Sequence, residues 1–206
     1  MLAPIALACV WYGGLTFTLL IDAATVLLVI EWLRLCRPAG ASWFMAGGTL
    51  WIVLAAAALL WLRADPTTGR ANLLFLLLLV WASDIGAYLV GRLIGGPRLA
   101  PLISPGKTWS GAAGGLAAAL AVGWGAAWTT TGGLARPAIV ALLLCIVGQL
   151  GDLAESYAKR RFGVKDSGTL IPGHGGLLDR LDALIAVAPF AALLALCLGR
   201  GVLLWE

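Results

Sequence analysis

The chain has 206 residues, of which 61% are hydrophobic and only 12% are charged, whereas about 25% of the residues of a soluble domain carry a charge. So few polar side chains cannot cover a globule of this size, and the composition therefore excludes a soluble globular protein and indicates a polytopic membrane protein. The net charge of +4 fits the basic loops of such a protein, and the absence of a basic run interleaved with aromatic residues argues against nucleic-acid binding.

Six hydrophobic segments are long enough to span a membrane as helices, which takes about 20 residues. In chain order they are residues 16–35, 43–62, 73–94, 111–130, 137–157 and 185–204. Residues 2–12 form a shorter apolar segment, which we expect to be a half-helix or a truncated first span. It has neither a basic start nor a cleavage site, so we expect it to be retained. We predict an all-α, polytopic integral membrane helical bundle with six to seven transmembrane helices.

Three of the predicted connections carry most of the basic residues. They hold Arg34 and Arg37, then Arg92, Arg98 and Lys107, and finally Lys159, Arg160, Arg161, Lys165 and Arg180. When the helices are threaded alternately, these three connections lie on the same side of the membrane. Short loops rich in Lys and Arg stay in the cytoplasm. We therefore expect the three connections to face the cytoplasm from the inner membrane of the cell.

Acidic residues lie near the ends of the last two predicted spans, where an ionisable group is costly and usually has a functional reason. Asp152 and Glu155 are three residues apart and Lys159 follows one turn later, so the three share one helix face. Asp179 and Asp182 are again three residues apart, on what looks like the start of the next helix. Because one loop joins the two helices, we expect their acidic faces to meet at the cytoplasmic membrane surface.

Carboxylates without His or Cys partners are the oxygen ligands that suit Mg²⁺. The same connection supplies cations for phosphate oxygens, namely Lys159, Arg160, Lys165 and Arg180. Its glycines, on both sides of His174, let backbone N–H groups approach an anion. Ser104, Lys107 and Thr108 form a second polar patch at a loop-to-helix junction, which favours a phosphate cradle although it is no Walker A motif. Together these parts indicate phosphoryl or nucleotidyl transfer.

Each feature taken alone has a simpler explanation. Arg161 fits an ordinary cytoplasmic loop, His174 fits a structural cap, and Glu155 with Lys159 fits an ordinary helix pair. None of these explains why carboxylates, a basic glycine-rich loop and a second polar loop gather on one face. The combination favours the functional interpretation.

Three sequence blocks resemble those of the phosphatidate cytidylyltransferases, or CDP-diacylglycerol synthases. The most specific is "SYAKRRFGVKDSGTLIPGHGGLLDRLD" at residues 156–182, which is similar to the family signature over its whole length. "WASDIGAYLVGRLIG" at residues 81–95 and "LAPLISPGKTWSG" at residues 99–111 precede it in the family's order. The resemblance thus covers about half of the chain, from residue 81 to residue 182.

The resemblance implies transfer of CMP from CTP to phosphatidic acid, giving CDP-diacylglycerol and pyrophosphate in phospholipid biosynthesis, with Mg²⁺ supporting the leaving group. The implied metal ligands are Asp152, Asp179 and Asp182. The implied catalytic residues are Asp152, Asp179, Lys159, Lys165 and Asp166, and the implied substrate-binding residues are Ser104, Lys107, Thr108, Arg160, His174, Arg180 and Asp84. The role of His174, a second, monovalent cation at the site and a homodimer in the lipid membrane are left open.

The chain departs from the family in three places. We expect residues 1–70 to be shortened N-terminal helices and residues 71–206 to be the catalytic core, within one transmembrane catalytic domain over residues 1–206. Ser110 stands where the family usually has Glu, and Ala158 where it usually has a larger aliphatic residue. None of these departures affects the carboxylates.

Three other functions compete with this interpretation. The CDP-alcohol phosphotransferases are also helical, Mg²⁺-dependent membrane enzymes, but their D-G-x2-A-R helix pattern is absent. A transporter with an acidic path through Asp84 and Asp152 would carry charges through both halves of the span, whereas here they concentrate at one surface. An inactive relative that acts as a scaffold is left open by the shortened N-terminal region.

Overall fold

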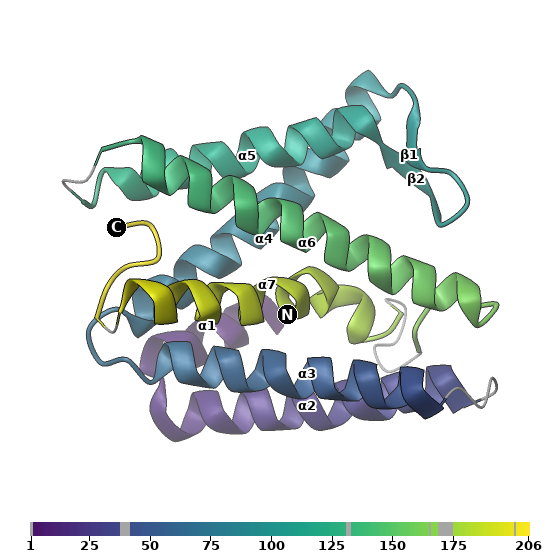
Figure 1. The fold of residues 1–206 in the computed structure, drawn as a ribbon, viewed down its shortest axis with the longest axis horizontal. Helices are drawn as coiled ribbons and strands as arrows, with labels where there is room; N and C mark the ends of the chain where they lie inside the picture. The colour runs from purple at the N-terminus through teal and green to yellow at the C-terminus, as the bar shows by residue number, and fades with distance from the viewer. Residues whose placement is uncertain (1, 38–41, 131–132, 165, 169–174, 200) are drawn as a thin grey trace.

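The computed structural model describes residues 2–37, 42–130, 133–164, 166–168, 175–199 and 201–206 (Figure 1). Within these residues, seven helices and a two-stranded hairpin follow one another along the chain. The helices are α1 (Leu2–Tyr12), α2 (Gly14–Cys36), α3 (Ser42–Arg63), α4 (Gly69–Ile94), α5 (Trp109–Ala127), α6 (Ala135–Arg161) and α7 (Leu178–Leu198). The strands are β1 (Arg98–Ala100) and β2 (Ser104–Thr108). The predicted all-α bundle is confirmed, with the hairpin as an addition to it.

The six helices α2 to α7 are each long and apolar enough to cross a membrane. Helix α1 has 11 residues, which is too short to span a membrane by itself, and the two expectations for this segment, a half-helix or a truncated first span, both stay predictions. Large apolar side chains cover the outside of the bundle; Leu19, Leu78 and Leu193 are each more than half exposed. Such a surface is stable in lipid and not in water, and the chain is therefore a polytopic membrane protein.

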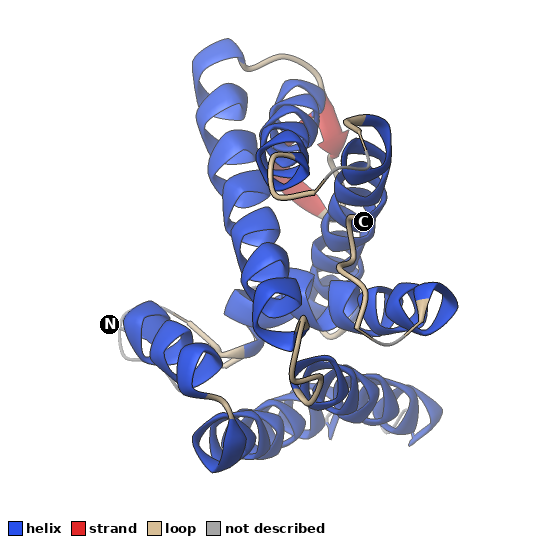
Figure 2. Cartoon of the chain, turned by 90° about the vertical axis from the view of Figure 1, so that its left-hand side faces the viewer, coloured by secondary structure: helices blue, strands red, loops and turns tan. Residues whose placement is uncertain are grey.

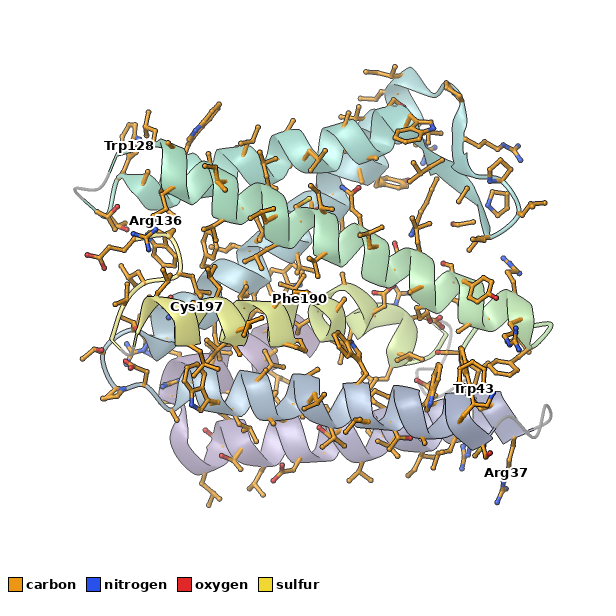
Figure 3. All side chains as sticks on the ribbon, viewed as in Figure 1. Arg37, Trp43, Trp128, Arg136, Phe190 and Cys197 are labelled. Carbon is orange, nitrogen blue, oxygen red and sulfur yellow. The ribbon has the colours of Figure 1, made fainter. Side chains whose placement is uncertain are left out.

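The two ends of the bundle differ in the connections that they carry. Figure 1 shows the end of α2 with the start of α3, the β1–β2 hairpin, and the end of α6 with the start of α7 at one end of the bundle, which we call the basic end. The α3–α4 and α5–α6 connections lie at the opposite end, together with the C-terminus. Trp43 and Arg37 mark the basic end in Figure 3, and Trp128 and Arg136 mark the opposite end. The three basic connections thus share one side, as the alternate threading predicted, and exposed Trp residues at both ends fit a membrane interface.

Helix α7 lies inside the bundle and packs against both α3 and α6. The contacts continue outward, from α3 to α2 on one side and from α6 to α5 and α4 on the other. Figure 2 looks along most of the helices from the end opposite to the hairpin, and α4 runs obliquely across the row in Figure 1. One cluster of buried apolar side chains contains residues from all seven described helices. The predicted division at residue 70 stays a prediction.

The structure corrects two boundaries of the predicted elements. Helix α7 begins at Leu178, where Asp179 and Asp182 predicted a helix start, but the apolar segment predicted for its span, residues 185–204, begins and ends later than the helix, because the first turns of α7 are polar and hydropathy alone does not detect them. The connection between α4 and α5 contains the antiparallel hairpin, with Arg98 paired to Thr108 and Ala100 to Ser104. Strands of three and five residues are too short to show a periodic pattern, and the segment was expected to be a loop.

At the opposite end, Asp65 ties the α3–α4 connection to the C-terminal tail. Its carboxylate accepts hydrogen bonds from the backbone N–H groups of Thr67 and Thr68, each at 2.9 Å, and from that of Gly201 at 3.0 Å. Asn72 forms hydrogen bonds with two further backbone groups of the tail. The hydroxyl of Thr67, followed by the backbone amide of Thr68, lowers the pKa of Asp65 well below its ordinary value.

Candidate functional site

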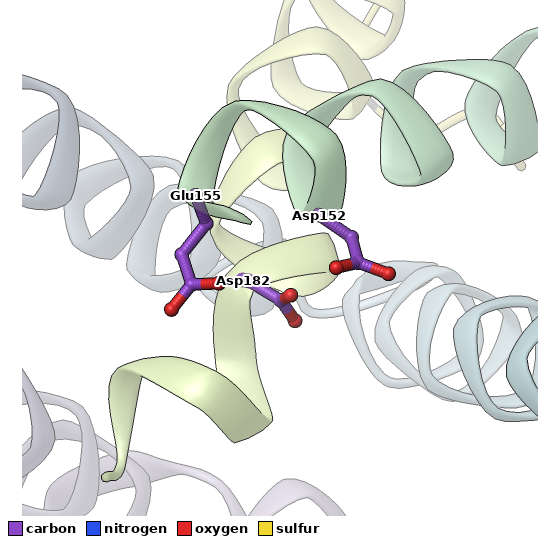
Figure 4. Close-up of side chains that lie close together, drawn as sticks. All are labelled: Asp152, Glu155 and Asp182. Carbon is purple, nitrogen blue, oxygen red and sulfur yellow. The ribbon is translucent and has the colours of Figure 1, made fainter. Parts of the chain in front are cut away.

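Three carboxylates converge where α6 meets α7. Asp152 and Glu155 project from one face of α6, and Asp182 projects from the second turn of α7 toward them (Figure 4). One oxygen atom of each lies within 4.8 Å of the others. Three negative charges at such distances repel each other, so the group is suited to hold a cation. We call Asp152, Glu155 and Asp182 the carboxylate triad.

The close approach of the two helices brings the triad together. Gly151 of α6 faces α7, and a Cβ atom at this position would lie 2.2 Å from the Cβ of Ala186. A larger residue would therefore push α6 away from α7 and separate Asp152 from Asp182. Small residues at helix contacts in membranes allow this kind of approach.

Lys159 joins the two helices beside the triad. Its ammonium group lies 2.6 Å from Glu155 on the same helix and 2.7 Å from Asp179 on α7. Asp179 also accepts backbone hydrogen bonds from Ser167 at 3.1 Å and from Gly176 at 3.0 Å. Asp179 therefore fastens both ends of the α6–α7 connection to α7, and the ion pair with Lys159 fixes that arrangement against α6.

The hairpin brings a second lysine to the triad. The ammonium group of Lys107, on β2, lies 2.5 Å from Asp152. Arg160 of α6 donates a hydrogen bond to the backbone carbonyl of Ile103 at 3.1 Å, which fastens the hairpin to α6. The second polar patch of the sequence and the acidic face of α6 thus form one site, although they are separated by more than forty residues.

The other residues of the second polar patch have structural contacts. Thr108 is the N-cap of α5, where its hydroxyl accepts a hydrogen bond from the backbone N–H of Gly111 at 3.0 Å. Ser110, which stands in place of the family's usual Glu, donates from its hydroxyl to the backbone carbonyl of Gly95. Ser104 lies on β2 and is half-buried. A substrate contact of Ser104 or Thr108 stays a prediction.

The remaining predicted site residues lie around this centre. Asp84 of α4 lines a small cavity with Ser83, Cys145 and Gln149, within electrostatic reach of Asp152 and Lys107. Arg180 lies in the first turn of α7 and is exposed. Asp166, in the α6–α7 connection, is exposed as well. Lys165 and His174 lie outside the described residues.

The triad differs in one member from the predicted set of metal ligands. The predicted ligands were Asp152, Asp179 and Asp182, whereas the structure brings Glu155 to Asp152 and Asp182 and leaves Asp179 in contact with Lys159 and two backbone amides. Glu155 was recognised as part of the acidic face but was not among the predicted ligands. Metal binding by Asp179 stays a prediction.

One buried carboxylate close to the site was missed altogether. Glu31 of α2 is 2% exposed and accepts backbone hydrogen bonds from Leu177 and Leu178, at the start of α7. An acidic residue inside a predicted span is a usable signal, since such residues are rare in lipid. Its partners, more than 140 positions away, could not be found from the sequence pattern.

The family of the chain follows from comparison with known proteins. Residues 42–198 match the cytidylyltransferase family. The phosphatidate cytidylyltransferase of Brucella suis biovar 1 (strain 1330) is 49% identical over 176 residues, which cover 84% of this chain and 63% of that protein. The protein of the same name from Haemophilus influenzae is 46% identical over 132 residues, which cover 61% of this chain and 46% of that protein. The protein of the same name from Staphylococcus saprophyticus is 42% identical over 144 residues, which cover 66% of this chain and 53% of that protein.

These matches bear on the site in two ways. The chain spans less than two thirds of the length of each of these relatives. The triad, Lys107 and Lys159 all lie within the residues that match the family, whereas Glu31 precedes them.

Proposed function

We propose, since this chain belongs to the cytidylyltransferase family, that it transfers the cytidylyl group of CTP to phosphatidic acid and forms CDP-diacylglycerol and pyrophosphate. The name phosphatidate cytidylyltransferase, which the relatives carry, supports this choice of substrates. The observation that carries the proposal is the carboxylate triad with Lys107 and Lys159 beside it. Carboxylates that can hold a cation, with lysines beside them, can supply the positive charge that a reaction between two phosphorylated substrates requires.

The proposed reaction is a displacement at phosphorus. A phosphate oxygen of phosphatidic acid forms a bond to the α-phosphorus of CTP, and the bond from that phosphorus to the β-phosphate oxygen breaks. Pyrophosphate leaves with the electron pair of that bond. Phosphatidic acid is already anionic at neutral pH, so no side chain needs to remove a proton. The protein therefore acts by positioning the substrates and by stabilising charge.

Lys107 and Lys159 are suited to contact the phosphates. Both ammonium groups already lie against carboxylates of the site, at 2.5 to 2.7 Å. In our proposal, Lys107 on β2 of the hairpin contacts the phosphates of CTP. Lys159 keeps α6 and α7 in their relative positions. Arg160 and Arg180 are exposed at the same end and can hold further phosphate oxygens.

The donor set of the triad fits Mg²⁺. Asp152, Glu155 and Asp182 offer carboxylate oxygens and no nitrogen or sulfur, which is the ligand type that Mg²⁺ prefers. A bound Mg²⁺ would neutralise charge on the phosphates and on the pyrophosphate that leaves. The triad would hold the ion, and Lys107 beside Asp152 would face the phosphates that the ion neutralises.

We further propose that the basic end faces the cytoplasm from the inner membrane. The three connections at this end are rich in Lys and Arg, and such loops are retained in the cytoplasm. This orientation would give the site access to CTP from the cytoplasm and to phosphatidic acid from the lipid. Membrane lipid would be the immediate environment of both substrate and product.

A product assay tests the function. The purified protein, labelled CTP and phosphatidic acid in mixed micelles are incubated with and without Mg²⁺, and the CDP-lipid is separated from CTP. We expect metal-dependent product, lowered by more than about a hundredfold in Asp152→Asn, because removing one stabilising charge commonly costs 10²–10³ in rate. Asp22→Asn is the matched control, since Asp22 is exposed on α2, a helix that contributes no residue to the triad. Folded protein that forms no CDP-lipid with any divalent cation would refute the proposal.

A labelling experiment tests the orientation. Cys9 and Cys197 are first replaced by Ser, and a single Cys is introduced either at Leu102 in the hairpin, 93% exposed, or at Trp128 at the opposite end, 88% exposed. A membrane-impermeant maleimide should label Leu102→Cys from the cytoplasmic side and Trp128→Cys from the other side. The reverse pattern would contradict the proposed orientation.

A further inference from the structure

Glu31 is a buried carboxylate in the part of the chain that precedes the family match. It lies on α2, is 2% exposed, and forms no ion pair with any cation among the residues that the structure describes. A buried charge is strongly unfavourable unless hydrogen bonds compensate for the lost water. The contacts that compensate for Glu31 should therefore be specific and stable.

Those contacts are the first amides of α7. One carboxylate oxygen of Glu31 accepts from the backbone N–H of Leu177 at 3.1 Å, and the other accepts from Leu178 at 2.7 Å. The first N–H groups of a helix have no partner within the helix, and the N-cap residue Leu177 has no side-chain oxygen to supply one. Glu31 supplies it from another helix, with a negative charge that the helix dipole favours at this end.

The α6–α7 connection leaves room for this carboxylate. A Cβ atom at Gly168 would lie 2.4 Å from a carboxylate oxygen of Glu31, and one at Gly176 would lie 2.5 Å from the same oxygen. The glycines of the connection were predicted to present their amides to a substrate phosphate. Among the described residues, one of these glycine amides, that of Gly176, instead faces Asp179, as does the amide of Ser167, and the amides of Leu177 and Leu178 face Glu31.

We infer that Glu31 is a positioning residue for the candidate site, because it fixes the start of the helix that carries Asp179 and Asp182. Asp179 follows Leu178 directly, and Asp182 follows one turn later. A shift of this turn would move Asp179 away from Lys159 and Asp182 away from the triad. The inference rests on the proposed function only where it concerns the reaction rate; the hold on α7 is independent of it.

Hydrogen exchange tests the hold on α7 without any substrate. Exchange of the amides of residues 175–182 is compared by mass spectrometry in the wild type, Glu31→Gln, Glu31→Asp and the control Asp22→Asn. Gln keeps the size of Glu but has one acceptor oxygen in place of two. Its NH₂ group would face one of the two backbone N–H groups, which are donors themselves. We expect about 10- to 100-fold faster exchange at the start of α7 in Glu31→Gln, as for the loss of a hydrogen bond to a charged group. In Glu31→Gln, the amides of residues 140–150 in α6 should exchange as in the wild type. In Asp22→Asn, the amides of residues 175–182 should also exchange as in the wild type.

Kinetics test the consequence for the site. In Glu31→Gln we expect kcat to fall by about 10- to 100-fold, because a misplacement of about 1 Å has that effect. The KM values for CTP and phosphatidic acid should stay within about twofold, since Glu31 contacts neither substrate. Glu31→Asp keeps the charge and should retain more of kcat and of the exchange protection than Glu31→Gln.

The outcomes separate the two proposals. Wild-type exchange in Glu31→Gln would overturn the inference, and so would a rise of KM with kcat unchanged. If the wild type forms no CDP-lipid but the amides at the start of α7 exchange faster in Glu31→Gln, the proposed function is refuted. The inference that Glu31 fixes the start of α7 is then still supported. If Glu31→Gln does not fold, Glu31→Asp takes its place in both measurements, because its shorter side chain cannot reach both amides.

Discussion

The two ends of the bundle use carboxylates in different ways. At the opposite end, Asp65 stands alone and is surrounded by donors, which are the amides of Thr67, Thr68 and Gly201 and a hydroxyl group. At the basic end, the triad and Asp179 share the two ammonium groups of Lys107 and Lys159. A carboxylate whose acceptor sites are filled by its own chain stabilises a connection. A group of carboxylates with too few donors keeps acceptor sites for a ligand.

The comparison also separates two carboxylates within the basic end. Asp179 resembles Asp65, because two backbone amides and one lysine occupy its oxygens. Asp182 accepts the backbone N–H of the adjoining Ala183 and otherwise faces the acidic residues of α6. Two aspartates three residues apart on the same helix therefore have different surroundings. The following substitutions test this distinction.

The largest effect is expected from Lys159→Met. This change leaves Glu155 and Asp179 without their shared cation, and an uncompensated buried charge costs about 3–5 kcal/mol. The free energy of unfolding, measured by denaturant titration in mixed micelles, should fall by that amount, and CDP-lipid formation should be lost with it. Lys159→Arg, which keeps the charge, should lose at most half as much unfolding free energy as Lys159→Met. An unchanged free energy of unfolding in Lys159→Met would show that Glu155 and Asp179 do not depend on their shared lysine, and would contradict the difference drawn between them and Asp65.

Asp182→Asn is expected to affect activity and not stability. The amide keeps the shape of the side chain and removes one of three mutually repelling charges, so the free energy of unfolding should not decrease. The rate of CDP-lipid formation should fall about 100- to 1000-fold, as for other losses of a single stabilising charge. Asp22→Asn serves as the control. A loss of stability with a normal rate would assign Asp182 the structural role of Asp65.

Asp65→Asn should give the opposite result at the other end. Loss of a carboxylate that accepts three backbone hydrogen bonds should lower the free energy of unfolding by about 1–2 kcal/mol, while kcat stays within about twofold of the wild type. A decrease of kcat comparable to that of Asp182→Asn would contradict the functional difference between the two ends.

The contribution of Asp65 to the free energy of unfolding should depend on pH in one direction only. The folded state lowers the pKa of Asp65, so the contribution is fully present above the unfolded pKa of about 4 and is lost as the pH falls toward the folded value. The difference in unfolding free energy between the wild type and Asp65→Asn should therefore be constant from about pH 5 to 8 and shrink below about pH 4. A difference that grows below pH 4 would contradict this sign.

The smallest effect is expected at Thr108, the N-cap of α5. Thr108→Ala removes the acceptor for the backbone N–H of Gly111 and should lower the free energy of unfolding by about 1 kcal/mol. Thr108→Ser keeps the cap and should be close to the wild type. The KM for CTP distinguishes the cap from the predicted substrate contact: an increase of tenfold or more in Thr108→Ala, with Thr108→Ser normal, would assign the hydroxyl to substrate binding.

The spans could be predicted from the sequence because hydropathy is a local property. Five of the six predicted segments lie wholly or largely within the corresponding helices, and the basic loops predicted correctly which connections share one end. The acidic face of α6 was predicted from the spacing of Asp152 and Glu155 alone, since helical geometry fixes which side residues three apart project from. The sixth segment, residues 185–204, begins and ends later than α7, because the first turns of this helix are polar and do not register as part of an apolar segment.

The remaining features depend on contacts between distant parts of the chain. Spacing could not tell that Glu155 completes the triad while Asp179 fastens a loop, because that depends on the rotation of α7 against α6. It could not tell that Lys107 reaches Asp152, because the hairpin that carries it leaves no periodic pattern. The partners of Glu31 lie more than 140 residues away.

The sequence by itself thus determined a membrane bundle, its basic end and the type of chemistry that its residues can support. Lipid selects apolar segments one at a time, and charged groups within them are costly and usually have a functional reason. Only the tertiary structure decided which carboxylates face each other and which are occupied by the chain's own amides. Each of those outcomes depends on how two helices pack, and packing is set by side chains that are far apart in the sequence.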